Sequence, residues 1–266
     1  DAAAFAKWGF DYLKYDWPVC DLEHTERMRQ ALDKTGRDFV LSLCTSCDWR
    51  LYDGYARSAN ILRANGDTRA RWSVILRNGF TGDHWSRLVR PGCWFDMDML
   101  GLGVMQMNVP SEENREGATD GLSRDEAITH FLAWACFPCS LQLSCDLSRL
   151  DDFTGALVAN EEVLAVNQDD FAGCAECVEE TRTERNGKLE RHVKLYRRPL
   201  ANGDVLFTAF NLGEVSEKVT CPLRTGDCTR FRDLLAGEDL ASPDFALPPH
   251  GARAVRMILK GNAANA

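Results

Sequence analysis

Two charged residues near the start of the chain, Lys14 and Asp16, are the first whose types and spacing suit chemistry. They lie in the aromatic and apolar stretch from Phe10 to Asp16, which predicts a short strand because Pro18 cannot donate to a ladder. Side chains alternate along a strand, so both charges face the same side. A cation beside a carboxylate favours the ionised form that a nucleophile requires. Asp16 is therefore a candidate nucleophile, and a structural ion pair is the alternative.

The composition is that of an ordinary globular protein and disfavours several classes of partner. The 266 residues are 45% hydrophobic and 27% charged, with a net charge of −9. An acidic chain without a basic cluster is a poor match for nucleic acid or an anionic membrane, so a neutral ligand fits better. No apolar run is long enough to span a bilayer. The chain opens with Asp1 and shows no leader, so we expect a fragment whose targeting signal lies outside it.

The eleven cysteines include three pairs with CxxC spacing, which can indicate zinc. The pairs Cys44/Cys47 and Cys136/Cys139 lie in apolar contexts without histidine at ligand spacing, where cysteine is usually a small buried hydrophobe. We therefore predict no metal site. Disulfides stay open, and an odd number leaves at least one thiol outside any intramolecular pair.

The first two thirds of the chain alternate between strand and helix patterns. A predicted helix from Glu23 to Lys34 is followed by an apolar run from Phe39 to Leu43, which is typical of a buried parallel strand. Ser123 and Glu126 form a capping box that begins a later helix. Further strands are predicted before the loop 63–67, within 91–100 and over Ser140 to Cys145.

Acidic residues recur where these strands end, which favours a (β/α) barrel whose site lies at the carboxyl ends of its strands. A doubly wound open sheet is the competitor, but the first strand lacks a glycine-rich phosphate loop. From about Glu180 the pattern changes to short strands, and Asn202-Gly203 marks a hairpin. We predict a barrel domain over residues 1–178 and an antiparallel β-sandwich over residues 179–266.

Several ordered segments together resemble glycoside hydrolase family 27, the α-galactosidase and α-N-acetylgalactosaminidase family, over nearly the whole chain. These segments are DYLKYD at 11–16, Arg63 with Asp67 four residues later, CWFDMDML at 93–100, the stretch 141–147 and the VNQD stretch that ends at Asp169. The family begins its barrel with three more strands. The resemblance therefore implies a partial (β/α)8 TIM barrel, about strands 4 to 8, followed by the β-sandwich.

The resemblance also implies roles for individual residues. Asp16 would be the nucleophile and Asp67 the general acid/base. The residues implied to contact the sugar are Lys14, Arg63, Trp17, Asp48, Trp94 and Asp98. For Trp94 a wall or core position, and for Asp98 a structural role, are the alternatives. Because a guanidinium paired with Asp67 would favour the carboxylate over the acid, we expect Arg63 to bind sugar hydroxyls and not Asp67.

The implied function is retaining exo-hydrolysis of terminal α-galactosides, in galactose-terminated oligosaccharides or polysaccharides, without metal or organic cofactor. This substrate class favours a secreted or periplasmic protein. Three residues depart from the family pattern. Phe95 and Met97 replace the Asn and the Pro of the WNDPDML motif, and Leu62 replaces the tryptophan before Arg63. The alternatives are therefore an α-N-acetylgalactosaminidase, a β-L-arabinopyranosidase, an isomaltosyl-releasing relative, or a carbohydrate-binding homologue without catalysis.

Overall fold

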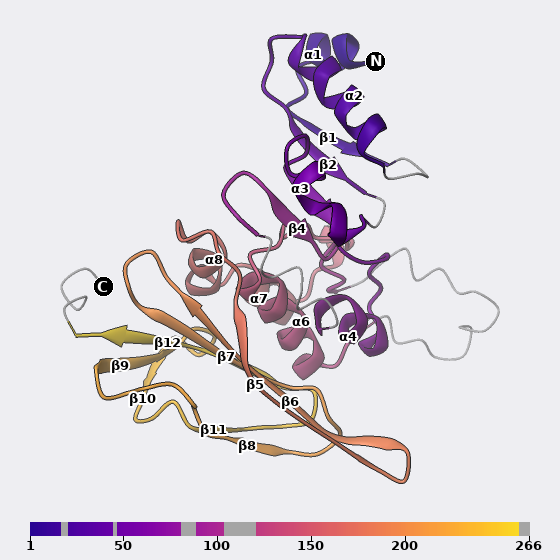
Figure 1. Cartoon of the computed structure of the whole chain (residues 1–266). Coiled ribbons are helices and arrows are strands. Elements are labelled where there is room, and N and C mark those ends of the chain that lie inside the picture. The colour runs from indigo at the N-terminus through magenta and orange to yellow at the C-terminus, as the bar shows by residue number, and fades with distance from the viewer. Residues whose placement is uncertain (17–20, 45–46, 81–88, 104–120, 261–266) are drawn as a thin grey trace.

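The computed structural model describes residues 1–16, 21–44, 47–80, 89–103 and 121–260 (Figure 1). The helices α1 to α3, with strands β1 and β2, lie at one end of the molecule, and the C-terminal strands lie at the other. The helices α4, α6, α7 and α8 lie between these two ends. No helix among the described residues is long and apolar enough to cross a membrane.

The N-terminal part contains a parallel sheet with the strand order β1-β2-β3-β4. Its strands are β1 (Tyr12–Tyr15), β2 (Val40–Leu43), β3 (Ile61–Arg63) and β4 (Trp94–Asp96). Its helices are α1 (Ala2–Trp8), α2 (Leu22–Asp33), α3 (Tyr52–Tyr55) and α4 (Trp72–Phe80). The alternation of strand and helix confirms the predicted α/β class, because parallel strands need crossover connections.

Side-chain caps mark where several helices begin. The side chain of Asp21 accepts a hydrogen bond from the His24 backbone N–H at 2.8 Å and begins α2. Helix α6 (Arg124–Cys136) begins with the predicted capping box, in which both reciprocal bonds between Ser123 and Glu126 form. Helices α7 (Asp152–Val158) and α8 (Glu161–Asn167) follow, each capped by the side chain that precedes it.

The predicted strand from Ser140 to Cys145 is wrong. Within the described residues, this segment contributes one parallel bridge, between Leu143 and Leu100. The physical reason lies in its neighbour: β4 ends at Asp96, and Asp98 adopts a left-handed backbone with φ 72° that redirects the chain. A strand needs a partner over several residues, and here Leu100 alone pairs with the segment, through Leu143.

The C-terminal part consists of two antiparallel sheets packed face to face. The larger sheet has the order β10-β9-β12-β7-β6-β5, and β8 pairs with β11 in the smaller one. The strands are β5 (Glu176–Arg185), β6 (Lys188–Pro199), β7 (Val205–Asn211), β8 (Glu217–Val219), β9 (Cys228–Asp233), β10 (Glu238–Leu240), β11 (Phe245–Leu247) and β12 (Ala252–Leu259). The turn around Gly203, with φ 88°, joins β6 to β7 as predicted. The proposed domain boundary after residue 178 lies inside β5.

Helix α6 joins the two parts through one continuous core. It packs against β12, and buried aromatic residues around it, among them Phe137, Tyr196 and Phe210, meet at centroid distances of 4.9 to 6.3 Å. The Thr129 hydroxyl donates to the His250 carbonyl at 2.6 Å, which fixes the register between helix and sandwich. The sandwich therefore packs on α6, which lies between it and the parallel sheet.

Strand β1 pairs with β2 and forms an edge of the sheet. Exposed aromatic side chains cluster beside this edge: Trp8 is 67% exposed, Phe10 52% and Tyr12 40%. An unpaired edge flanked by apolar surface is a site of self-association. We therefore expect the 266-residue chain on its own to aggregate and to lack glycosidase activity.

Substitution of Tyr12 by lysine is expected to reduce this self-association, because charge on an edge strand opposes edge-to-edge pairing. Light scattering of the 266-residue chain at matched concentrations measures the effect. Leu147→Lys is the matched control, since Leu147 is 65% exposed but lies in the short helical turn 147–149, away from β1. Equal improvement by both variants would assign the effect to net charge and not to the edge.

Candidate active site at the carboxyl ends of the parallel strands

The strand register arranges side chains in rows across one face of the sheet. One row holds Lys14, Ser42, Ile61 and Trp94. The row above it, at the carboxyl edge, includes Arg63 and Asp96. The opposite face carries Leu13, Leu41, Leu43, Leu62 and Phe95, which pack in the main hydrophobic core. Period-2 alternation thus gives the sheet one apolar face under the helices and one face that carries the charged residues.

Arg63 is the centre of the charged row and is only 2% exposed. Its Nη2 lies 2.8 Å from Oδ1 of Asp98 and 2.8 Å from Oδ1 of Asp67. Its Nη1 donates to the Cys44 sulfur at 3.4 Å, and its buried Nε has no partner among the described residues. A buried guanidinium is stable only when carboxylates compensate it, so Arg63 holds these groups in a defined arrangement.

The ion pair with Asp67 contradicts the expectation that Arg63 avoids this carboxylate. The reason is that the charge of Arg63 is neutralised mainly by the buried carboxylate of Asp98, which is 3% exposed. Asp67 is 63% exposed, so its share of the pair is solvated and weak. Asp67 therefore stays accessible to a ligand while one of its oxygens is oriented.

Asp98 has the structural role that was one of its two predicted alternatives. Its Oδ2 accepts from the Thr68 backbone N–H at 2.5 Å, and its carbonyl accepts from the Trp134 indole at 2.6 Å. Helix α6 also holds the next residues, because Gly101 N–H donates to His130 Nε2 at 2.9 Å. Burial lowers the pKa of His130 to about 3, so this acceptor stays neutral. The segment after β4 is thereby fixed to α6.

Cys44 connects the strand of Asp16 to that of Arg63. Its backbone N–H donates to the Tyr15 carbonyl at 3.2 Å, which continues the β1–β2 ladder past the last paired residues. Burial raises the pKa of the Cys44 thiol, Arg63 and Lys14 lower it, and Asp16 raises it. Because Arg63, Lys14 and Asp16 all act on the Cys44 thiol, the three charged side chains lie around this one residue. The sequence reasoning treated this cysteine as packing and missed it, although its place at a strand end was the available signal.

Lys14 is the cation of the nucleophile strand. Partial burial lowers its pKa, but Cys44 and Asp98 raise it, and the pKa lies above its ordinary value. Lys14 therefore carries its charge throughout the neutral range. Asp16, two residues further on, is exposed at the carboxyl end of β1. Lys14 and Asp16 are exposed while Leu13 and Tyr15 are half-buried, which is the alternation expected of a strand.

The remaining predicted contacts are dispersed. Trp17 lies outside the described residues. Asp48 is paired with Arg50 at 2.7 Å, and hydrogen bonds from Arg50 lower its pKa. Trp94 begins β4 and lies a row below the charged edge, where it lines a cavity with Ile61 and Pro91. A wall or core position was one of its predicted alternatives, and its contact with a sugar stays a prediction.

Asp96 is a buried carboxylate beside Arg63 that the prediction left aside. Its Oδ1 accepts from the Asp98 backbone N–H at 2.8 Å, and the Cys139 sulfur lies 3.9 Å away. Burial raises the pKa of Asp96, while Arg63 opposes the shift. Its 8% exposure makes it a supporting group for Arg63 and not an accessible one.

The CxxC spacing of the cysteines raises two possibilities in the described part of the chain, a metal site and disulfides. No group of three or more His, Cys, Asp or Glu side chains there is arranged to hold a metal ion. None of the cysteines that the structure describes forms a disulfide.

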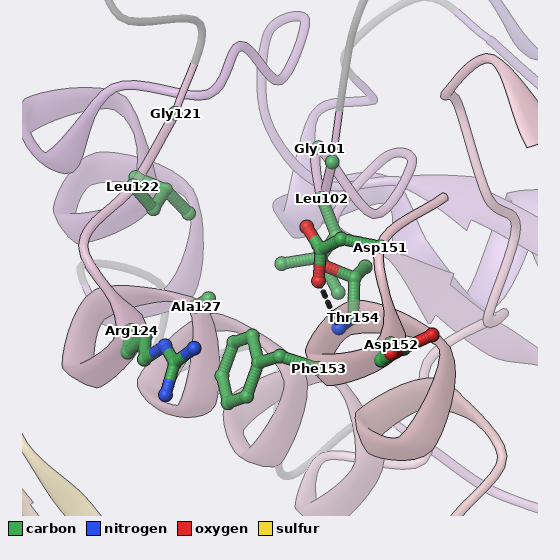
Figure 2. Close-up of a pocket in the computed structure, with 11 residues that line it drawn as sticks. Gly101, Leu102, Gly121, Leu122, Arg124, Ala127, Asp151, Asp152, Phe153 and Thr154 are labelled. Carbon is green, nitrogen blue, oxygen red and sulfur yellow. Dashed lines mark hydrogen bonds between the residues drawn. The ribbon is translucent and has the colours of Figure 1, made fainter. Parts of the chain in front are cut away.

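A cavity of about 460 Å³ lies at the first turns of α6 and α7 (Figure 2). Its lining includes Gly101, Arg124 and Phe153, and the Arg124 guanidinium lies 4.9 Å from the centre of the Phe153 ring. Asp151 points toward the cavity in Figure 2 and caps α7 through a 2.8 Å bond to Thr154 N–H. None of the predicted catalytic or sugar-contacting residues lines it, so the charged edge of the sheet is the better candidate.

Replacement of Arg63 by methionine is expected to lower the free energy of unfolding of the complete gene product by about 3 to 5 kcal/mol, because Asp98 would be buried without its partner. Denaturant titration followed by far-UV circular dichroism measures this. Arg63→Lys is the control, since it keeps the charge but not the forked geometry, and should lose less. A loss below about 1 kcal/mol for Arg63→Met would show that the pair is not a structural centre.

Comparison with known proteins gives two matching family descriptions. Residues 1–169 match "Alpha galactosidase A", and residues 190–257 match "Alpha galactosidase C-terminal beta sandwich domain". Alpha-galactosidase 2 of Arabidopsis thaliana is 30% identical over 246 residues, which cover 88% of this chain and 55% of the relative. The chain thus spans about half the length of this relative.

Two solved structures show the same fold. The GH27 β-L-arabinopyranosidase of Geobacillus stearothermophilus matches with a TM-score of 0.79 and 27% identity, over 98% of this chain and 60% of that one. The Saccharomyces cerevisiae α-galactosidase solved with raffinose matches with a TM-score of 0.78 and 20% identity, over 98% and 75%. A parallel α/β region that forms part of a barrel, followed by an antiparallel β-sandwich, is therefore confirmed.

Proposed function

Because this chain belongs to the alpha-galactosidase A family, we propose that the protein carrying it is a retaining exo-glycosidase that hydrolyses terminal α-galactosides. The observation that carries the proposal is the carboxyl edge of the sheet, where Lys14 and Asp16 end one strand and Arg63 leads into Asp67 from another. Double-displacement glycoside hydrolysis requires two carboxyl groups that flank the scissile bond, and this edge carries two exposed carboxylates.

The spacing of the strands is compatible with this chemistry. β1 and β3 are separated by β2, which places their backbones about 10 Å apart at about 4.8 Å per strand. Two aspartate side chains that lean toward a sugar between them can reach the separation of about 5 to 5.5 Å typical of retaining enzymes. Asp16 and Asp67 are both exposed at this edge, so both are accessible to substrate.

In the proposed mechanism Asp16 attacks the anomeric carbon while Asp67 donates its proton to the departing glycosidic oxygen. A glycosyl ester forms at Asp16 and the aglycone leaves as an alcohol. Asp67, now a carboxylate, takes a proton from water, whose oxygen attacks the same carbon and releases Asp16. Lys14 stabilises the carboxylate of Asp16 before attack and after release, and can donate to a sugar hydroxyl.

A second candidate is the hydrolysis of β-L-arabinopyranosides, favoured by the Geobacillus relative. β-L-Arabinopyranose has the ring configuration of α-galactose without the hydroxymethyl group. A pocket that admits or excludes that group would decide between the two substrates. The same catalytic pair would serve both.

The test is an assay of the complete gene product on nitrophenyl α-galactoside, β-L-arabinopyranoside and α-N-acetylgalactosaminide. We expect the highest kcat/KM on the α-galactoside, and proton NMR should show the α-anomer as the first product. A first product of inverted configuration would reject the double displacement. Binding of galactose without turnover of any substrate would identify a carbohydrate-binding homologue.

A further inference from the structure

We propose that Asn78, on helix α4, is a positioning residue that holds the loop carrying the general acid/base Asp67. This inference rests on the proposed function, because it assigns Asn78 a role in that reaction. Asn78 lies eleven positions after Asp67 in the chain and is 1% exposed. It does not approach the reacting atoms itself.

The contacts of Asn78 fall on both sides of Asp67. Its Nδ2 donates to the Gly66 carbonyl at 2.8 Å and to the Thr68 hydroxyl oxygen at 3.0 Å. The backbone carbonyl of Asn78 accepts a hydrogen bond from Asn65 Nδ2 at 2.9 Å. The residues before and after Asp67 are therefore tied to one side chain and its backbone, while the carboxylate of Asp67 projects away, 63% exposed.

We call the contacts of Asn78 with Asn65, Gly66 and Thr68 the clamp. Thr68 also links the clamp to the buried ion pair of Asp98 and Arg63. Its hydroxyl donates to the Met97 carbonyl at 3.2 Å, and its backbone N–H donates to Asp98 at 2.5 Å. Asp98 in turn pairs with Arg63, which returns to Asp67. The contacts form a closed path in which the Asp67 loop is held from α4 on one side and from the end of β4 on the other.

Helix packing alone does not account for an asparagine at this position. Asparagine is a poor helix former, and a buried amide is costly unless its hydrogen bonds are made. Its neighbours on α4 include the buried Ile75 and Phe80, so an apolar residue would serve the core. The Asn78 Oδ1 accepts from the neighbouring Arg77 Nε at 3.2 Å, but both hydrogen bonds that the buried amide donates go to the Asp67 loop, which is the reason to assign it a positioning role.

The experiment uses the complete gene product and compares two substrates that differ in their need for an acid. Asn78→Leu is expected to lower kcat/KM by about 100-fold on an alkyl or disaccharide α-galactoside, the scale of a small misplacement of a catalytic group. On 2,4-dinitrophenyl α-galactoside, whose leaving group departs without a proton, the loss should stay within a few-fold. Asn78→Asp keeps the shape but removes both donors and should show the same split.

Ile75→Val is the matched control on the same helix. It should lower the melting temperature while leaving the ratio of kcat/KM values for the two substrates unchanged, because Ile75 makes core contacts and is not part of the clamp. Asn65→Ala removes one bond of the clamp, the one that the half-buried Asn65 donates to the Asn78 backbone carbonyl. It should reproduce the substrate-dependent split more weakly. This variant keeps the inference testable even where the Asn78 variants fold poorly.

Equal losses on both substrates in Asn78→Asp and Asn65→Ala, or a wild-type ratio in all clamp variants, would overturn the positioning role while leaving the glycosidase in place. A wild-type protein without activity on either substrate would instead overturn the proposed function, and this inference with it. The two failures are therefore distinguished by the wild-type measurement.

Discussion

Asp16→Asn in the complete gene product should abolish turnover and leave the fold intact. The amide cannot attack the anomeric carbon, so no glycosyl ester forms, and kcat should fall by roughly 10⁴-fold or more, the scale seen when a covalent nucleophile is removed. Asp16 is exposed at the end of β1, so its replacement by an isosteric amide should change the melting temperature little. Steady-state kinetics and circular dichroism measure the two effects.

External azide provides the diagnostic experiment for Asp16. In Asp16→Asn the small anion can enter beside the amide and attack an activated α-galactoside from the face on which residue 16 lies, which yields the β-galactosyl azide. Asp11→Asn is the matched control, because Asp11 precedes the same strand at its opposite end and is paired with Arg37. Wild-type turnover in Asp16→Asn would remove this residue from the mechanism.

Asp67→Asn should produce a loss that depends on the leaving group. An alkoxide needs a proton to depart, so disaccharides should lose about 10² to 10⁴-fold, the range of general acid catalysis. An activated aryl oxide leaves unaided, so the first step should survive with such substrates. The second step should still slow, because the same residue activates water, and the glycosyl-enzyme should accumulate.

A burst of nitrophenolate followed by a slow steady state is the expected signature of Asp67→Asn with an activated substrate. Mass spectrometry of the trapped protein should show the added sugar. Asp53→Asn is a suitable control, because Asp53 is 86% exposed and pairs with Arg90 on the surface. Equal losses for good and poor leaving groups, with no accumulated intermediate, would assign the acid to another residue.

Several features were predictable from the sequence because short-range physics determines them. The capping box at Ser123 sets the start of α6 through two bonds within four residues. The turn at Gly203 joins two strands because its left-handed backbone suits glycine. The common face of Lys14 and Asp16 follows from alternation alone. The α/β class and the change to antiparallel strands likewise follow from local periodicity.

Other features were decided by the tertiary structure, because they depend on groups distant in the chain. The segment from Ser140 to Cys145 has a strand-like composition, but within the described part of the chain it forms a single bridge, to Leu100. Arg63 was expected to avoid Asp67, yet it pairs with it because the buried Asp98, 35 positions further on, draws the guanidinium to that end of the sheet.

The sequence by itself determined which residue types are available for chemistry and that they follow strands. It could not determine the supporting contacts of Cys44, between two strand ends, or of Asn78, behind the Asp67 loop, since both contacts join segments that are separate in the chain. Their roles arise when parallel strands and a crossover helix bring separated residues within hydrogen-bond distance. Contacts of this kind depend on the packing of whole elements, whereas caps, turns and alternation depend on a few adjacent residues.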